Sequence, residues 1–389
     1  MNRSGFQAVP SLIVGLVGLA LLIIGGLRDP SGFFRAYLMG YTVWLALGLG
    51  SLGVLLVQFL TGGVWGLAIR RICEAATATV PLLAVLFLPV LLGMPELYVW
   101  ARPEAVAADP VLQHKAPYLN IPFFVGRSLV YLICWVVVAV LLRRWSAAHD
   151  RTGDPLVLRR LQRLSIVGAL SVGLTVSFAA IDWLMSLDAD WFSTMYPPLV
   201  AMRSLLTSLA FAILVLALLA PRSRLGELTT AQLYNELGSL LLAFLMLWTY
   251  MAYFQYLLIW AGNLSDEIPW YLRRVEGGWG PVATSLIVFG FAVPFWSLLF
   301  RPLKRNRRAL ALVAAWLLGM HFVDVYWLVE PPFQPGGPRV SWLDVFAVVG
   351  IGGVWLAIFA WQLTRRPLLP RFDPRWVTVE ALEAVRGEA

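Results

Sequence analysis

The sequence predicts an all-α integral membrane protein, and two observations lead to this prediction. Hydrophobic residues make up 60% of the 389 positions and charged residues only 13%, whereas soluble globular chains are about 45–50% apolar and about 25% charged. The apolar residues also gather into runs of about 20, the length of helix that crosses the roughly 30 Å hydrocarbon core of a bilayer. This composition excludes a soluble enzyme, a disordered chain and a nucleic-acid-binding protein.

We predict ten membrane spans, each helical because unpaired backbone groups find no water inside a bilayer. In chain order the spans cover residues 10–27, 37–60, 74–94, 121–142, 163–186, 197–220, 236–261, 279–300, 309–330 and 341–364. The first run follows Arg3 but has no small-residue cleavage site. We therefore expect it to be a retained span and not a signal peptide.

Basic residues predict the orientation of the spans. Of the 30 lysines and arginines, 20 lie in the termini and the even-numbered connections, and seven lie in the opposite connections. Cytoplasmic connections carry such an excess of basic residues. Both termini are therefore expected on the cytoplasmic side, and the net charge of +8 reflects orientation and not nucleic-acid binding.

A shift of four spans preserves orientation and reveals a weak internal repeat. Glu74 opens the third span and Glu236 the seventh, and each lies at the cytoplasmic side. Asp182 and Asp324 lie in the outer parts of the fifth and ninth spans, and a Trp-Leu pair follows each of them. We therefore predict two four-helix bundles, made of spans 2–5 and spans 6–9. The corresponding segments are 1–36 (first span and outer connection), 37–196 (first bundle), 197–340 (second bundle) and 341–389 (tenth span and cytoplasmic tail).

The cysteines and histidines are too few and too scattered for a resident metal centre. Cys73 and Cys134 lie on separate segments, and the sequence contains no CxxC or CxxCH motif for an iron–sulfur cluster or a c-type haem. Of the three histidines, only His321 lies inside an apolar run, so two histidines cannot face each other across a b-type haem. Any redox centre is therefore expected on a partner.

The ninth span carries the strongest candidate for a proton-carrying site. An ionisable side chain inside a bilayer costs roughly 2.5–3.5 kcal/mol on insertion scales, so it needs a partner, water or a function. His321 and Asp324 are three residues apart and share one helix face. Together with Asp182 they could hold and pass protons, because an imidazole accepts and releases a proton near neutral pH. The alternative is a structural pair that pins two helices together.

Other polar residues near or inside the spans have two interpretations each. Glu74 and Glu236 are candidate proton entries, or carboxylates favourably placed at helix N-termini. Tyr250 and Tyr253 share a face of the seventh span. They form either a hydrogen-bonded path towards the outer side or ordinary aromatic packing.

Two arginines at span edges are candidates for ion pairing. We expect Arg203, near the outer end of the sixth span, to pair with Asp182 or Asp188, and Arg127 to act similarly at the start of the fourth span. Such residues are usually structural pairs or extend their charged ends towards the interface.

Polar and aromatic motifs mark the fifth, seventh and ninth spans. They are AIDWLMSL at 180–187 followed by WFST at 191–194, YFQYLLIW at 253–260 followed by Asn263, Glu267, Trp270 and Tyr271, and GMHFVDVYW at 319–327. Together they resemble the ActF-type membrane subunit of bacterial alternative complex III, within the wider group of NrfD-type and polysulfide-reductase-type membrane subunits. The likeness covers essentially the whole chain.

The resemblance implies a subunit of a quinol-oxidising respiratory or photosynthetic complex in the bacterial inner membrane, not catalytic alone. It implies three kinds of partner besides lipid: a sister NrfD-like quinol-binding subunit (ActC), an iron–sulfur subunit (ActB) and c-type cytochrome subunits. The ActF-type subunit itself is haem-free and contains half-channels suggestive of proton movement. By family position Asp182, His321 and Asp324 become the expected proton path, and this chain is expected to bind no cofactor. No quinol ligands can be carried over.

Three other functions stay open on the sequence alone. A quinol-binding NrfD-like subunit would itself feed electrons to an iron–sulfur partner. A purely structural scaffold would need only its surfaces. A secondary transporter is compatible with parallel repeats and carboxylates at membrane depth, but no pair of interrupted helices with a convincing substrate pocket is evident.

Overall fold

The computed structural model describes residues 8–63, 65–222 and 229–368, which form helices and no strands. Ten helical segments in these residues are long and apolar enough to cross a membrane. They are α1 (Ala8–Gly26), α2 (Pro30–Thr61), α3 to α5 (Trp65–Leu92), α9 (Ile121–Thr152), α10 (Pro155–Trp183) with η2 (Met185–Leu187), α11 (Tyr196–Leu219), α13 (Ala231–Gly262), α15 to α16 (Gly280–Leu299), α18 (Arg307–Val329) and α19 (Trp342–Thr364). The prediction of an all-α, multi-pass membrane protein is confirmed.

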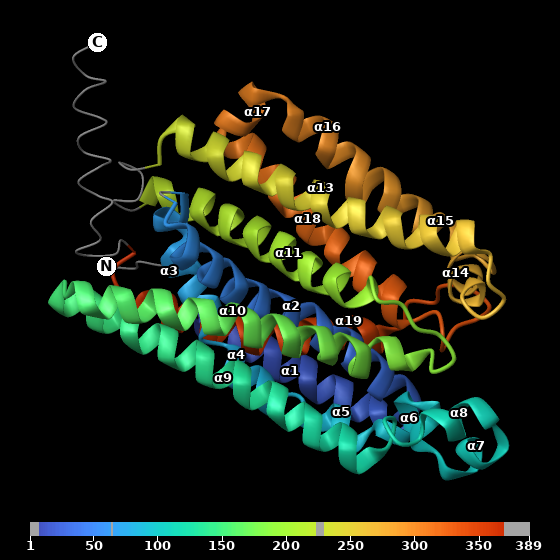
Figure 1. The fold of residues 1–389 in the computed structure, drawn as a ribbon. Coiled ribbons are helices and arrows are strands. Elements are labelled where there is room, and N and C mark those ends of the chain that lie inside the picture. Colours follow the sequence, from blue (N-terminus) through green and yellow to red (C-terminus); the bar gives the residue numbers. More distant parts are fainter. Residues whose placement is uncertain (1–7, 64, 223–228, 369–389) are drawn as a thin grey trace, which may run out of the picture.

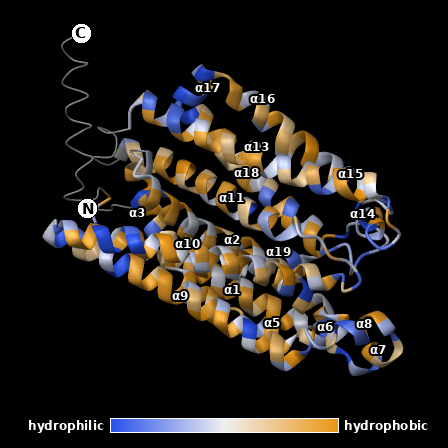
Figure 2. Cartoon of the chain, in the orientation of Figure 1, coloured by the Kyte–Doolittle hydropathy of each residue, from blue (hydrophilic) through white to orange (hydrophobic). Residues whose placement is uncertain are grey.

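Shorter helices connect the spans at the two ends of the molecule. They are α6 (Met94–Leu97), η1 (Val99–Ala101), α7 (Pro103–Ala108), α8 (Pro110–Lys115), η3 (Ala220–Arg222), α14 (Ile268–Val275) and α17 (Arg301–Arg305). In Figure 1, α6 to α8 and α14 lie at one end of the long helices, and α17 lies at the other. Figure 2 shows hydrophilic residues concentrated at these two ends, with a hydrophobic zone between them. This distribution fits a protein whose middle is surrounded by lipid.

Capping side chains define where several long helices begin. Asp29, Asn120 and Asp154 each accept a hydrogen bond from a backbone N–H in the first turn of α2, α9 and α10, and each of these helices has a proline at its first or second position. Proline fits there because its missing N–H has no partner in a helix start anyway. Thr230 and Ser341 cap α13 and α19 in the same way. Helices α9 and α10 are longer than their apolar segments and meet at the polar turn that contains Gly153.

Two spans are irregular, and prolines explain where. Pro81 and Pro89 each stand at the start of a new helix, so the third span consists of α3 (Trp65–Thr77), α4 (Val80–Val85) and α5 (Leu88–Leu92). In the eighth span, α15 (Gly280–Ser285) continues as the π-helix η4 (Leu286–Ala292), which ends just before Pro294 in α16 (Val293–Leu299). Proline lacks the N–H that the helix ladder needs and clashes with the preceding turn.

Close backbone contacts hold the helices together at two places. The central helices α2 and α11 pack against each other, and a Cβ added to Gly50 would lie 1.9 Å from the carbonyl oxygen of Ser204. At the periphery α1 packs along α19, where a Cβ on Gly353 would lie 2.4 Å from Cα of Gly15. Small residues permit such close approach between helices in membranes.

Helices α1 and α19 are antiparallel, which places the two ends of the described chain. Gly15 near the start of α1 lies against Gly353 near the end of α19, whereas Gly25 lies against Trp342 at the start of α19. The start of α1 and the end of α19 therefore lie at the same end of the molecule. This end also holds α17 and the turn between α9 and α10.

Candidate functional site

Asp182 lies near the end of α10, fully buried, and three donors satisfy its carboxylate. Arg127 of α9 donates from Nε at 2.8 Å and from Nη2 at 2.9 Å, and the Tyr131 hydroxyl donates at 2.8 Å. The Arg127 guanidinium lies 3.9 Å from the centroid of the Tyr118 ring and 4.2 Å from that of Phe123. This bidentate, ring-stacked geometry fixes the pair rigidly. Asp182 is therefore best suited to holding α9 and α10 together.

Asp324 of α18 is also buried, but only half of its carboxylate is satisfied. Its Oδ1 pairs with Nη2 of Arg203 from α11, while its Oδ2 has no hydrogen-bond partner among the described residues. The Arg203 guanidinium lies 3.6 Å from the ring centroid of Trp248 on α13, and its Nε also lacks a partner among those residues. Buried polar atoms in native proteins are nearly always hydrogen-bonded, to protein or to water. This site therefore has hydrogen-bonding capacity for water or a proton.

The pairing expected for Arg203 was wrong. Arg203 contacts Asp324, and neither Asp182 nor Asp188, because α11 packs against α18 and turns this face towards it. Arg127 pairs with Asp182 instead. Asp188, in the turn after α10, forms ion pairs with Arg273 and Arg274 at the end of α14.

His321 lies one turn from Asp324 but makes a different contact. Its Nε2 lies 3.3 Å from the carbonyl oxygen of Val43 on α2, and its Nδ1 is buried without a partner among the described residues. Because a carbonyl oxygen only accepts, this contact places the ring hydrogen on Nε2 and a free lone pair on Nδ1. His321 and Asp324 therefore share a buried region in which each has one unsatisfied acceptor atom.

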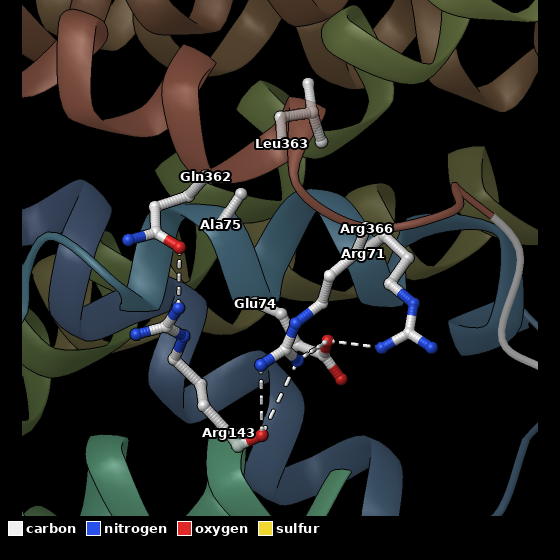
Figure 3. Close-up of a pocket in the computed structure, with 7 residues that line it drawn as sticks. All are labelled: Arg71, Glu74, Ala75, Arg143, Gln362, Leu363 and Arg366. Atoms are coloured by element: carbon white, nitrogen blue, oxygen red, sulfur yellow. Dashed lines mark hydrogen bonds and ion pairs between the residues drawn. The ribbon is translucent and has the colours of Figure 1, made fainter. Parts of the chain in front are cut away.

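Glu74 lies inside a cluster of charges at the end of the molecule that holds α17. Its carboxylate accepts from Arg70 at 3.1 Å, from Arg71 and Ser146, and from Arg366 beyond α19 at 3.4 Å. Figure 3 shows Glu74 between the guanidinium groups of Arg71 and Arg366. The carboxylate is 3% exposed, and these donors stabilise its ionised form, so it is poorly suited to take up a proton.

The other candidates from the seventh span face outwards. Glu236 is exposed and accepts a hydrogen bond from Gln232 at 3.1 Å, an environment unlike that of Glu74. The Tyr250 and Tyr253 side chains are 61% and 60% exposed on the surface of α13. Because they point away from the helix bundle, these tyrosines do not line a path within the described part of this chain. On the opposite face of the same helix, Gln255 is buried and donates to the Tyr271 hydroxyl.

Sequence reasoning missed a buried carboxylate pair at the end opposite Glu74. Glu330 follows α18 directly, is 0% exposed and forms an ion pair of 2.9 Å with Arg35 of α2. Gln334 donates to its Oε2 at 2.8 Å, while its Oε1 lacks a partner among the described residues, as does Oδ1 of the nearby Asp344. Burial, reinforced by the Asp344 charge, outweighs Arg35 and raises the pKa of Glu330 to about 8. The available signal was a carboxylate at a span edge in a chain with few charges.

Within residues 8–63, 65–222 and 229–368, no group of three or more histidine, cysteine, aspartate or glutamate side chains is placed to hold a metal ion. Comparison with models of protein families and with curated protein sequences found no match to this chain. The site must therefore be interpreted from its own chemistry.

Proposed function

We propose that this chain is a haem-free and cluster-free membrane subunit of a quinol-oxidising electron-transfer complex, similar to the ActF type of alternative complex III. In this proposal it lies in the bacterial inner membrane with both termini in the cytoplasm. It provides a proton path, while a sister NrfD-like subunit binds quinol and iron–sulfur and c-type cytochrome subunits carry the electrons.

The Asp324 site is the observation on which the proton path rests. A buried unpaired polar group costs about 1–3 kcal/mol unless water or a proton satisfies it. Here Oδ2 of Asp324, Nε of Arg203 and Nδ1 of His321 are all unpartnered among the described residues. Oδ2 of Asp324 is the atom that takes a proton, and Nδ1 of His321 is a second acceptor one helical turn away.

Buried hydroxyl groups support a continuation of the path towards Glu74. Ser51 of α2 lies eight residues from Val43, the contact of His321, which corresponds to about 12 Å along a helix. A Cβ on Gly48 would lie 3.4 Å from Oγ1 of Thr79, so Ser51 lies near the last turn of α3, which contains Thr77. The hydroxyls of Ser51 and Thr77 are both buried without partners among the described residues, as expected for groups that bind water.

Helix contacts support the two bundles in this proposal. In the first set, α2 contacts α3 to α5 and α10, and α9 contacts α4 and α10. In the second set, α11 contacts α13 and α18, and α16 contacts α13 and α18. Helices α2 and α11, the first helices of the two sets, contact each other. The Asp324 site lies beside this contact between α2 and α11, which are the two most buried of the described spans.

The test replaces Asp324 by Asn in the complex purified through a tag on this chain and reconstituted into liposomes. We expect the complex to assemble, and the rate of proton transfer across the membrane to fall about 100-fold or more, from the lower end of the range for a lost acid–base group. Asp324→Glu should restore part of this transfer. Asp266→Asn, at an exposed position after α13, is the matched control and should behave like the wild type.

Two results would contradict the proposal. Full proton transfer at a full rate of quinol oxidation in Asp324→Asn would remove Asp324 from the path. Equal loss of assembly in Asp324→Asn and Asp324→Glu, with normal transfer in the complexes that form, would indicate a scaffold. A quinone-analogue photolabel that reacts with this chain would favour direct quinol binding.

A further inference from the structure

A pocket at the Glu74 end of the molecule contains more positive than negative charge. It lies between α3, α9, the last turn of α19 and the residues just after it. The side chains of Arg71, Arg143 and Arg366 line it together with Glu74 and Gln362. Figure 3 shows the three guanidinium groups around this space. Because these elements are far apart in the sequence, the folded structure alone brings the three arginines together.

The carboxylates of the cluster are already used by other arginines. Glu74 is bound by Arg70 and Arg71, and Asp150 pairs with Arg71. Arg366 reaches Glu74 only at 3.4 Å. Among the described residues, four guanidinium groups therefore face two carboxylates.

Arg143 shows this excess of positive over negative charge most clearly. Its Nη2 donates to the neutral amide oxygen of Gln362 at 2.8 Å, and no described carboxylate lies within ion-pair distance of it. The Arg366 guanidinium approaches the Arg143 carbonyl oxygen at 3.5 Å, so the two cations are neighbours. Partly buried charges in proteins are normally paired. Arg143 has no carboxylate partner among the described residues, and Arg366 shares Glu74 with Arg70 and Arg71. This shortage of negative charge indicates an anion that is supplied from outside the chain.

The charge and position of the site favour a phosphate group. Guanidinium groups bind phosphate oxygens with two parallel hydrogen bonds each, and basic pockets between membrane helices on the cytoplasmic side bind lipid headgroups. On the bilayer side of Arg143 along α9, Ile133 is 61% exposed on the outside of the helix. A phospholipid bound at the pocket would place its acyl chains along this apolar surface.

We propose that Arg143 and Arg366, supported by Arg71, bind the phosphate group of an anionic phospholipid. This site does not depend on the proton path, because it lies at the end of the helices and uses none of the atoms at Asp324. An inorganic or soluble phosphate has the same chemistry as the headgroup, and the experiment below distinguishes these two sources of the phosphate group.

The experiment measures lipid binding to the full-length chain in detergent by native mass spectrometry, with thermal unfolding recorded in parallel. The probes are phosphatidylglycerol, zwitterionic phosphatidylcholine and inorganic phosphate. We expect phosphatidylglycerol to bind in preference to phosphatidylcholine. Its affinity should fall roughly tenfold in Arg143→Gln and in Arg366→Gln, as expected for the loss of a charged hydrogen-bonding group.

Arg144→Gln is the matched control, because Arg144 is the next residue on α9 and is exposed. It should keep wild-type affinity. An equal loss in Arg143→Gln and Arg144→Gln, or equal binding of the two lipids, would overturn the proposal. Thermal stabilisation by inorganic phosphate that is lost in Arg143→Gln, without a lipid preference, would also overturn the phospholipid proposal and would identify a soluble phosphate as the ligand. Size-exclusion profiles matching the wild type show that each variant is folded.

Discussion

Asp182 and Asp324 occupy similar positions near the C-terminal ends of α10 and α18, yet their surroundings differ in the protonation states that they allow. Three donors hold Asp182, so protonation would break a complete network. One guanidinium holds Asp324, and one of its oxygens stays unpartnered among the described residues. The sequence predicted both carboxylates as buried candidates, but not this difference. The arginine that pairs with a given carboxylate depends on the rotation and tilt of whole helices. The spacing of residues within one span does not determine these.

Glu330 leads to a prediction at the same scale. Its pKa in the folded protein is about 8, raised from 4.5 mainly by burial, so the folded state disfavours its ionised form. The contribution of Glu330 to stability is therefore fully present below about pH 4.5 and is lost as the pH rises to about 8. Glu330→Gln removes this titration. The melting temperature of the wild type should fall relative to that of the variant as the pH is raised from 5 to 9.

The measurement is thermal unfolding of both proteins in detergent across this pH range, compared as a difference so that other titrating groups cancel. Glu104→Gln, at an exposed residue in α7, should show no such trend. A constant difference between wild type and Glu330→Gln from pH 5 to pH 9 would show that Glu330 is ionised throughout.

At the scale of elements, the length of each apolar run predicted every described span, because hydrophobicity is a property of each segment by itself. The ends of the helices differed from the prediction wherever a cap or a proline decided them. Helix α2 begins at Pro30 after the Asp29 cap, several residues before the expected start at 37. Contacts between helices, such as that of α1 with α19, depend on small residues whose partners only the fold reveals.

The α1–α19 contact allows a direct test. In Gly353→Ala the new Cβ would lie 2.4 Å from Cα of Gly15, a backbone atom that can move only with its helix. We expect a loss of about 1–3 kcal/mol, as for other overpacked contacts, seen as a lower melting temperature in detergent. Gly173→Ala on α10 is the control, since nothing lies within 4 Å of its Cβ, and it should be neutral or slightly stabilising. Equal effects of the two changes would show that α1 is not held by this close contact.

At the scale of the whole molecule, the basic residues that decided the predicted orientation also take part in the structure. Arg71 pairs with Asp150, Lys304 donates to Ser239, and Arg307 donates to the carbonyl oxygen of Ala217. These contacts join different helices at one end of the molecule. The basic residues at this end, whose excess predicts a cytoplasmic location, therefore also tie neighbouring helices together.

Orientation can be measured with single cysteines in a chain that carries Cys73→Ala and Cys134→Ala. Glu104→Cys places a thiol on exposed α7, and Arg151→Cys places one at the exposed end of α9, at the opposite end of the helices. A membrane-impermeant maleimide should label position 104 in intact spheroplasts and position 151 only after permeabilisation, with both labelled in detergent. The reverse pattern would place the termini outside. It would also put the arginine pocket against the outer leaflet, because that pocket lies at the same end of α9 as Arg151.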